Sequence, residues 1–286
     1  MNDKNYDQIK IEDLKLFAYH GVFDHENQNG QNFYVNAILY LNTEYAGDMD
    51  SLDCSVDYGA VCELIRKTMT EHVYQLIETV AQKIAEAILL QYPLVDHVEI
   101  EVRKPDAPVA MDFKSISVKI RRAWHTAVIA LGSNLGDSKA YLQDAVQKLQ
   151  DDSKIRNVRQ SGWILTKPYG YTQQPDFLNG AVILETLYSP SRLLQFMQEI
   201  ENQAGRTREI HWGARTLDLD LIFYDDRILN QPELIVPHPD LQNRDFVLKP
   251  VAEIAPYYFH PVLHKTICQL LEDLEIKNNK NNNYEN

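Results

Sequence analysis

The chain has 286 residues, of which 44% are hydrophobic and 24% charged, so it is long enough for two domains and has an ordinary globular composition. Its formal net charge of −13 argues against general nucleic-acid binding, which needs a basic surface. No apolar run reaches the roughly 18 residues of a membrane span, and the first residues lack a signal-peptide pattern. Cys54, Cys62 and Cys268 are isolated and lack metal-ligand spacing. We therefore expect a cytoplasmic protein with reduced thiols and with neither nucleic-acid nor membrane partners.

The first half of the chain has the pattern of four strands and two helices. Residues 33–41 alternate apolar and polar side chains as a half-buried strand does, and Asp57 is placed to cap a helix. The predicted elements are strands at 8–18 and 33–41, helices at 57–69 and 77–89, and strands at 98–102 and 116–120. This ββααββ order predicts an antiparallel sheet with one layer of helices. The other face would be partly uncovered, which favours self-association.

The second half repeats neither this order nor its spacing. The predicted elements are strands at 126–131, 158–165, 180–186 and 217–222, with helices at 137–150 and 193–204. This βαββαβ order is typical of a ferredoxin-like sheet with helices on one face. The fold class is therefore α+β, with domains predicted at 1–122 and 123–276. Residues 277–286 are rich in Asn and Lys and are predicted to be a disordered tail.

Asp218 and Asp220 are two carboxylates two residues apart inside an alternating apolar strand. Successive side chains of a strand point to opposite faces, so both carboxylates share one face. Their mutual repulsion is most simply compensated by a divalent cation, or by two. The preceding segment carries Arg206, Arg208 and Arg215, and cations beside a metal-binding acid pair indicate a polyphosphate substrate. Taken alone, the acid pair would more often be a solvated edge strand.

Residues 126–276 resemble 6-hydroxymethyl-7,8-dihydropterin pyrophosphokinase. The resemblance rests on the block Gly-Ala-Arg-Thr-Leu-Asp-Leu-Asp at 213–220 and on the His238 and Arg244 motifs that follow it. It implies transfer of a pyrophosphoryl group from ATP to the hydroxymethyl oxygen of a pterin, with release of AMP. It also implies that Asp218 and Asp220 hold two Mg²⁺ ions.

The same resemblance implies roles for further residues of the second half. Catalytic residues on a loop that closes over the reacting groups would be Arg206 and Arg208. Residues that contact ATP would be Gln198, Glu201, Arg215, His238 and Arg244. A flat pterin needs aromatic faces and an amide at its polar edge. Residues that bind it would be Asn179, Trp212, Phe246, Phe177, Thr166 and Tyr169.

Four short motifs in the first half are individually weak. The Tyr-His-Gly motif at 19–21 with Glu26, the helix start at 56–59, Glu78 and Lys104 each have an ordinary structural interpretation, such as a turn, a helix cap or a strand end. Together, in order and at fitting separations, they resemble dihydroneopterin aldolase across residues 7–121. That family has the T-fold, an antiparallel sheet with two helices, and assembles rings with active sites between subunits. The resemblance therefore implies a homo-oligomer.

The implied reaction is the retro-aldol cleavage of 7,8-dihydroneopterin to glycolaldehyde and 6-hydroxymethyl-7,8-dihydropterin, without metal or other cofactor. Lys104 would be the general acid/base, Tyr58 its partner in proton delivery, and Glu26 would orient the substrate or a water. Pterin-binding residues would be Glu78, Ile77 and Val56. His20 is expected to be structural.

Because the product of the first reaction is the acceptor of the second, the sequence predicts a bifunctional enzyme of folate biosynthesis. One alternative is a kinase whose first half is only a platform for self-association. Another is an RNA-binding module on a ferredoxin-like fold, which the acidic charge disfavours.

Overall fold

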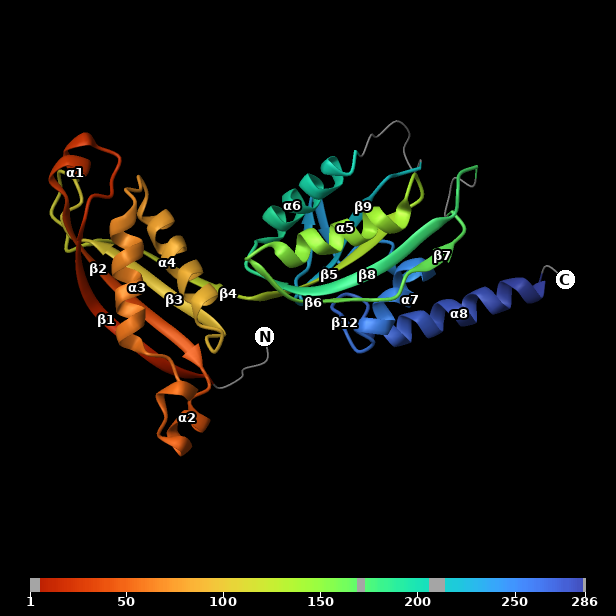
Figure 1. Ribbon diagram of the computed structural model, residues 1–286, viewed down its shortest axis with the longest axis horizontal. Helices are drawn as coiled ribbons and strands as arrows, with labels where there is room; N and C mark the ends of the chain where they lie inside the picture. The colour runs from red at the N-terminus through yellow and green to blue at the C-terminus, as the bar shows by residue number, and fades with distance from the viewer. Residues whose placement is uncertain (1–5, 169–172, 206–213, 285–286) are drawn as a thin grey trace. The chain divides into compact units, whose positions relative to one another are not determined.

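The computed structural model describes residues 6–168, 173–205 and 214–284, with side chains in the last helix described as far as residue 280. The chain divides into two compact units, Met1–Trp124 and His125–Asn286 (Figure 1). This division falls two residues after the boundary predicted at 122/123. Over the described ranges, no helix is both long enough and apolar enough to cross a membrane.

The first unit is built on a four-stranded antiparallel sheet in the order β1-β2-β3-β4. The strands are β1 (Asp7–Ala18), β2 (Gln31–Leu41), β3 (His97–Lys104) and β4 (Ile116–Ala123). Two helices, α3 (Tyr58–Glu71) and α4 (Ile77–Gln91), pack on one face of this sheet (Figure 1). The predicted T-fold arrangement of one sheet and two helices is confirmed.

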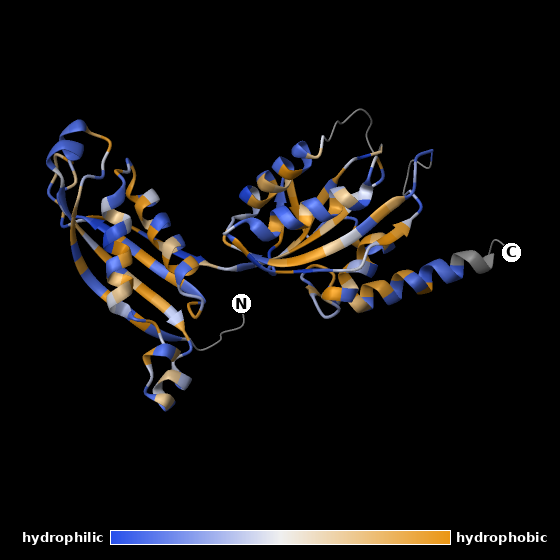
Figure 2. Ribbon diagram, in the orientation of Figure 1, coloured by the Kyte–Doolittle hydropathy of each residue, from blue (hydrophilic) through white to orange (hydrophobic). Residues whose placement is uncertain are grey.

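Strand β2 shows how the sequence directs one face of this sheet inward. Alternate side chains from Phe33 to Leu41 are at most 1% exposed, while the intervening ones are only half-buried. Figure 2 shows the same alternation of apolar and polar positions along the strands. The opposite face carries polar pairs, such as Lys119 with Glu99 at 2.7 Å and Asn36 with Glu101 at 2.9 Å. The helical layer therefore covers the apolar face.

A local signal explains where helix α3 begins. The side chain of Asp57 accepts hydrogen bonds from the backbone N–H groups of Gly59 and Ala60, so the predicted cap of α3 is confirmed. Three short elements were not predicted: α1 (Asp24–Asn29), α2 (Glu44–Met49) and the 3₁₀ turn η1 (Leu52–Cys54). Each has six residues or fewer, too short for a periodic hydrophobic pattern. Among them, α1 carries Glu26.

The second unit contains a five-stranded sheet in the order β6-β8-β5-β9, with β7 also paired to β8. The strands are β5 (His125–Ser133), β6 (Ile155–Gln160), β7 (Ile164–Thr166), β8 (Phe177–Thr186) and β9 (Asp218–Tyr224). Helix α5 (Ser138–Asp151) follows β5, and α6 (Pro190–Gln203) follows β8. This is the expected ferredoxin-like βαββαβ topology, so the α+β fold class is confirmed.

The expectation that helices cover only one face of this sheet is wrong. Helices α5 and α6 cover one face, while α7 (Asp245–Ile254) and α8 (Ile267–Tyr284) cover the other (Figure 1). The physical reason lies in β5, whose two faces are both apolar. Ala127, Ile129 and Leu131 belong to the core beneath α5 and α6, whereas Val128 and Ala130 belong to the core beneath α7 and α8.

The predicted disordered tail also differs from the structure. Helix α8 continues to Tyr284, so residues 277–284 are helical. Ile267, Leu270 and Leu274 bury one side of the first two turns against α7 and the sheet. The Asn- and Lys-rich residues prolong a helix that this apolar anchor has already begun. Shorter elements complete the unit: β10 (Leu229–Gln231), β11 (Leu234–Val236), η2 (Leu241–Asn243), β12 (Phe259–His260) and β13 (Lys265–Thr266).

Candidate active sites

A row of residues across the second sheet forms the floor of a pocket. Strand pairing places Asp218 of β9 opposite Gly132 of β5, and Gly132 opposite Asn179 of β8. A Cβ atom on Gly132 would lie only 2.9 Å from Asn179 Oδ1. Glycine at this position therefore leaves room for the Asn179 side chain above the sheet. The register of three strands thus brings a carboxylate and an amide to the same pocket.

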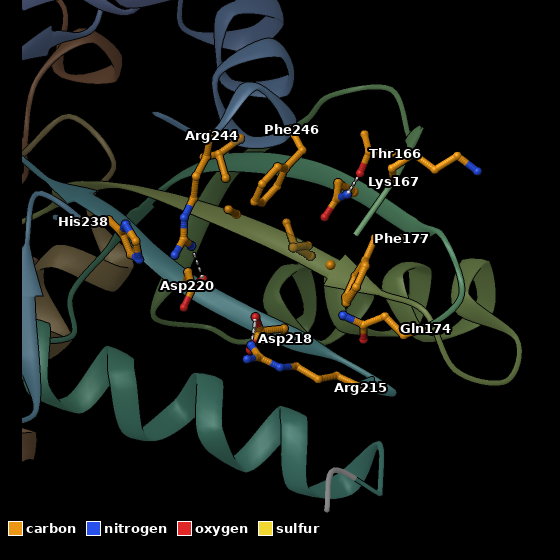
Figure 3. A pocket seen from close by; sticks show the side chains of 15 residues that line it. Thr166, Lys167, Gln174, Phe177, Arg215, Asp218, Asp220, His238, Arg244 and Phe246 are labelled. Carbon is orange, nitrogen blue, oxygen red and sulfur yellow. Dashed lines mark hydrogen bonds and ion pairs between the residues drawn. The ribbon is translucent and has the colours of Figure 1, made fainter. Parts of the chain in front are cut away.

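Asp218 and Asp220 both line this pocket, so their predicted sharing of one strand face is confirmed. Each carboxylate faces an arginine (Figure 3). Arg215 donates to Asp218, and Arg244 Nη1 lies 3.9 Å from Asp220 Oδ2. Burial and the adjacent Asp218 carboxylate raise the pKa of Asp220, and Arg244 and Arg215 oppose that rise. The carboxylates are thus held together against their mutual repulsion by two guanidinium groups.

Glu201 and Gln198 are both on α6 but differ in position. Glu201 is 3% exposed, and its carboxylate accepts a hydrogen bond from Leu219 N at 2.8 Å. Leu219 lies between the two aspartates, so Glu201 holds the backbone that carries them. Gln198 is exposed and is not among the residues that line the pocket.

His238 and Arg244 line one side of the pocket, and the charge on that side comes from Arg244 (Figure 3). Burial, assisted by the Arg244 guanidinium, lowers the pKa of His238 to about 4. The ring is therefore neutral at pH 7. Its Nδ1 accepts from Asp240 N at 3.3 Å, which leaves Nε2 as the protonated donor. Arg244 is oriented by Asp240, whose Oδ2 accepts from Nε at 3.0 Å.

Aromatic and amide groups occupy the remaining walls. Phe177 and Phe246 point into the pocket from two sides (Figure 3). Asn179 is 6% exposed, and its Nδ2 donates to Thr166 Oγ1 at 2.8 Å. A buried amide in a pocket that is also lined by two aromatic rings suits a flat ligand with hydrogen-bonding groups on its edge. The structure therefore brings together the predicted residues Thr166, Phe177, Asn179 and Phe246.

Four predicted residues, Tyr169, Arg206, Arg208 and Trp212, lie outside the described residues. The pocket also contains residues that sequence reasoning missed, among them Lys167 and Gln174. Lys167 directly follows Thr166 and pairs with Asp176 at 3.0 Å. Because Lys167 is adjacent to a predicted pocket residue, the sequence did carry a signal that it could line the pocket. No sequence feature indicated Gln174, because a single glutamine before a strand is as common in an ordinary loop as in a binding site.

The donor set of the pocket fits magnesium. Mg²⁺ is usually bound by one or two carboxylates together with waters and substrate phosphates, rather than by a full protein cage. Asp218 and Asp220 supply two carboxylates, and among the described residues no group of three or more His, Cys, Asp or Glu side chains has the geometry of a metal site. Two carboxylates beside arginines therefore suit a metal that enters with a polyphosphate.

The first unit has a separate buried ion pair. Lys104, at the end of β3, donates to Glu26 Oε1, and the two side chains are 10% and 2% exposed. Glu26 also accepts from Gln31 Nε2 and from Phe23 N, both at 3.1 Å. Burial alone would raise the pKa of Glu26, but the hydrogen bonds from Lys104 and Phe23 outweigh it and lower the pKa.

The turn before α1 makes room for this carboxylate. Gly21 has φ +155°, and a Cβ atom there would lie 2.3 Å from the Glu26 carboxylate. His20 is fully buried, and its Nδ1 accepts from Tyr74 N at 3.1 Å. Burial lowers the pKa of His20 to about 4. Its full burial and the hydrogen bond from the Tyr74 backbone suit the expected structural role.

The other predicted aldolase residues lie at the starts of α3 and α4. Tyr58 is 65% exposed, and Glu78 is also exposed, whereas Val56 and Ile77 are buried. No contact between Tyr58 or Glu78 and the Lys104–Glu26 pair is present within the described part of this single chain. The structure thus brings together two of the predicted residues, while Tyr58 and Glu78 face solvent.

Taken together, two α+β units that each enclose a polar site define a two-domain enzyme. The model of the family "7,8-dihydro-6-hydroxymethylpterin-pyrophosphokinase" matches residues 128–256, and the dihydroneopterin aldolase model matches residues 9–121. A pyrophosphokinase of Synechocystis is 47% identical over 151 residues, which cover 53% of this chain and 77% of that protein. The chain therefore belongs to the 7,8-dihydro-6-hydroxymethylpterin-pyrophosphokinase family, and its first unit is a dihydroneopterin aldolase domain.

Other relatives carry both domains in one chain. The folic acid synthesis protein fol1 of Schizosaccharomyces pombe is 29% identical over 282 residues, which cover 94% of this chain but only 37% of that protein. A crystal structure of Escherichia coli dihydroneopterin aldolase in complex with neopterin aligns with 41% of this chain and 99% of that chain, at 24% identity and a TM-score of 0.38. The assignment rests on the sequence matches, which support two enzyme domains of folate biosynthesis rather than a kinase on an inert platform.

Proposed function

We propose that the pocket of the second unit transfers a pyrophosphoryl group from ATP to the hydroxymethyl oxygen of 6-hydroxymethyl-7,8-dihydropterin and releases AMP. The observation that carries this proposal is the pairing of Asp218 and Asp220 with Arg215 and Arg244 in one pocket, beside the buried amide of Asn179. Phosphate-binding and pterin-binding groups thus share a single cavity.

Each side of the pocket has a distinct task. Arg215 and Arg244 contact the triphosphate, and the Nε2 proton of neutral His238 adds a hydrogen bond. Asn179 and Thr166 read the polar edge of the pterin, which lies between Phe177 and Phe246. The two ligands meet between the aspartates of β9 and the Asn179 side chain, for which Gly132 leaves room. Holding acceptor and donor in line supplies much of the rate enhancement.

Magnesium completes the charge balance of this arrangement. Asp218 and Asp220 would hold two Mg²⁺ ions, as the family resemblance implies. When bound, magnesium neutralises the phosphate charge that otherwise repels the attacking oxygen. With magnesium on the aspartates, Arg215 and Arg244 would turn from the carboxylates to phosphate oxygens. Arg206 and Arg208 are proposed as further catalytic groups, and Glu201 as the residue that holds the backbone of the aspartates.

The first unit is proposed to produce the acceptor. In a retro-aldol cleavage of dihydroneopterin, a base removes the proton of the hydroxyl group that becomes the aldehyde. The carbon–carbon bond then breaks, and its electron pair passes into the ring imine. An acid finally protonates the carbon that remains on the pterin. The buried Lys104–Glu26 pair supplies proton transfer at this site, because each group can exchange a proton with a substrate oxygen or a water.

Self-association is proposed to complete the aldolase site. The exposed positions of Tyr58 and Glu78 at helix starts suit residues that act on a pterin bound against a neighbouring copy. In that arrangement Glu78 accepts from the pterin amino and ring N–H groups, with Ile77 and Val56 beside it. Tyr58 delivers the proton.

One incubation tests both proposals. The full chain is mixed with dihydroneopterin, ATP and Mg²⁺, and products are resolved by mass spectrometry. Glycolaldehyde and AMP are expected. Formation of ADP in place of AMP contradicts the kinase proposal, and absence of glycolaldehyde contradicts the aldolase proposal. Asp220→Ala should abolish AMP formation and spare glycolaldehyde release. Lys104→Ala should abolish glycolaldehyde release, and AMP should then form only when 6-hydroxymethyl-7,8-dihydropterin is added to the mixture.

A further inference from the structure

Asn134 is a buried polar residue that the reaction proposed above does not use. It directly follows β5 and is 5% exposed. Its Oδ1 accepts from Arg215 N at 2.7 Å, and its own N–H donates to Arg215 O at 3.0 Å. Its Nδ2 donates to Gln174 Oε1 at 3.2 Å and to Pro175 O at 3.1 Å. One residue therefore bonds two segments that are distant in sequence.

These two segments build different walls of the pocket. Gln174 lies beside Phe177 on the wall proposed to hold the pterin, whereas Arg215 pairs with Asp218 on the wall proposed to hold the phosphates (Figure 3). Asn134 reaches both walls because its amide has an acceptor at one atom and donors at the other. An aspartate would keep the bond to Arg215 but lose the donations to Gln174 and Pro175.

We propose that Asn134 is a positioning residue that couples the nucleotide and pterin subsites of this pocket. It ties the Arg215 backbone to the segment that carries Gln174, so a ligand that orders one wall also orders the other. Binding of the second ligand then costs the protein less conformational entropy, because its wall is already ordered. This appears as positive cooperativity between the two ligands. This inference rests on the proposed kinase function.

The test measures cooperativity rather than activity alone. The affinity of the full chain for α,β-methylene-ATP with Mg²⁺ is measured by calorimetry, without and with saturating 6-hydroxymethylpterin, and the converse titration is also done. In Asn134→Asp and Asn134→Ala the coupling factor should fall by roughly fivefold or more, the lower end of typical couplings. The Kd of each ligand measured alone should change by a smaller factor than the coupling factor does.

Two further variants keep the result interpretable. Thr186→Val removes the hydrogen bond that the buried Thr186 Oγ1 accepts from Tyr188 N at the other end of β8, and it should leave the coupling factor unchanged. Gln174→Ala removes one partner of Asn134 from a less buried position, so it carries the same test if Asn134→Ala unfolds, with a smaller loss of coupling.

A coupling factor that stays within about twofold of wild type in all three pocket variants would overturn the proposal. So would a wild-type chain that binds both ligands with no cooperativity. A wild-type chain that binds neither ligand would instead contradict the proposed kinase function.

Discussion

Gly132 and Asn179 are paired across β5 and β8, and a Cβ atom on Gly132 would lie 2.9 Å from Asn179 Oδ1. Contacts this short force a shift, and the movable partner is the Asn179 side chain. That amide also donates to Thr166, so displacing it disturbs the polar side of the pocket.

Gly132→Ala should therefore weaken pterin binding in the second unit. Loss of one good hydrogen bond, about 1 to 1.5 kcal/mol, corresponds to a roughly tenfold higher Kd for 6-hydroxymethylpterin. Affinity for the ATP analogue should change less, because Asn179 is on the pterin side. Gly47→Ala is the matched control, since a Cβ atom there meets nothing within 4 Å. Equal losses for both ligands would show that Gly132 supports the whole pocket rather than Asn179.

Lys104→Met should destabilise the first unit as well as abolish aldolase activity. The change leaves the Glu26 carboxylate buried without its cation, which typically costs about 3–5 kcal/mol. The free energy of unfolding is measured by urea denaturation. The matched control, Lys119→Met, breaks a pair with Glu99 in which the lysine is 58% exposed, so its effect should be about 0–1 kcal/mol. Similar losses in both variants would contradict the importance assigned to burial.

His20 should make the first unit acid-sensitive. Its folded-state pKa is lowered to about 4 from the ordinary value of 6.5, so the unfolded chain binds the proton first as the pH falls. The stability contributed by neutral, buried His20 is complete above pH 6.5 and declines as the pH falls towards 4. The loss reaches about 3 kcal/mol at pH 4, from about 1.4 kcal/mol for each unit of pKa difference.

This expectation is checked by urea unfolding of wild type and His20→Gln between pH 7 and pH 4. The wild-type curve should fall more steeply over this range, because the glutamine does not titrate. NMR titration of the imidazole should show a midpoint near 4. Parallel stability curves for the two proteins would contradict the prediction.

Metal removal should abolish the stabilisation of the second unit by ATP. A ligand present at about 100 times its Kd stabilises a folded protein by about 2.7 kcal/mol. ATP with Mg²⁺ should therefore raise the melting temperature of the second unit in scanning calorimetry, and EDTA should reverse the rise. Asp218→Asn should eliminate the Mg²⁺-dependent part. Asp144→Asn, which alters an exposed pair with Lys148 on α5, should behave as wild type. A rise that persists in EDTA would contradict the two-aspartate metal site.

Several features were accessible from the sequence because they depend on neighbouring residues. The shared face of Asp218 and Asp220 follows from the two-residue period of a strand. The cap at Asp57 depends on N–H groups two and three residues ahead. The βαββαβ order of the second unit follows from the local pattern of each of its segments. That order of elements allows only a few sheet topologies.

Other features depend on contacts between residues far apart in the chain. Glu26 and Lys104 are 78 positions apart, and Asn134 lies 40 and 81 positions from Gln174 and Arg215. The second helical layer on the ferredoxin-like sheet has the same origin, because α7 and α8 carry apolar sides that pack against the distant strands β5, β8 and β9. The sequence by itself determined the two domains and the acid pair. Tertiary packing decided which loops meet around that pair, since hydrogen bonds of long sequence separation form only once the sheet has set the distance between the segments.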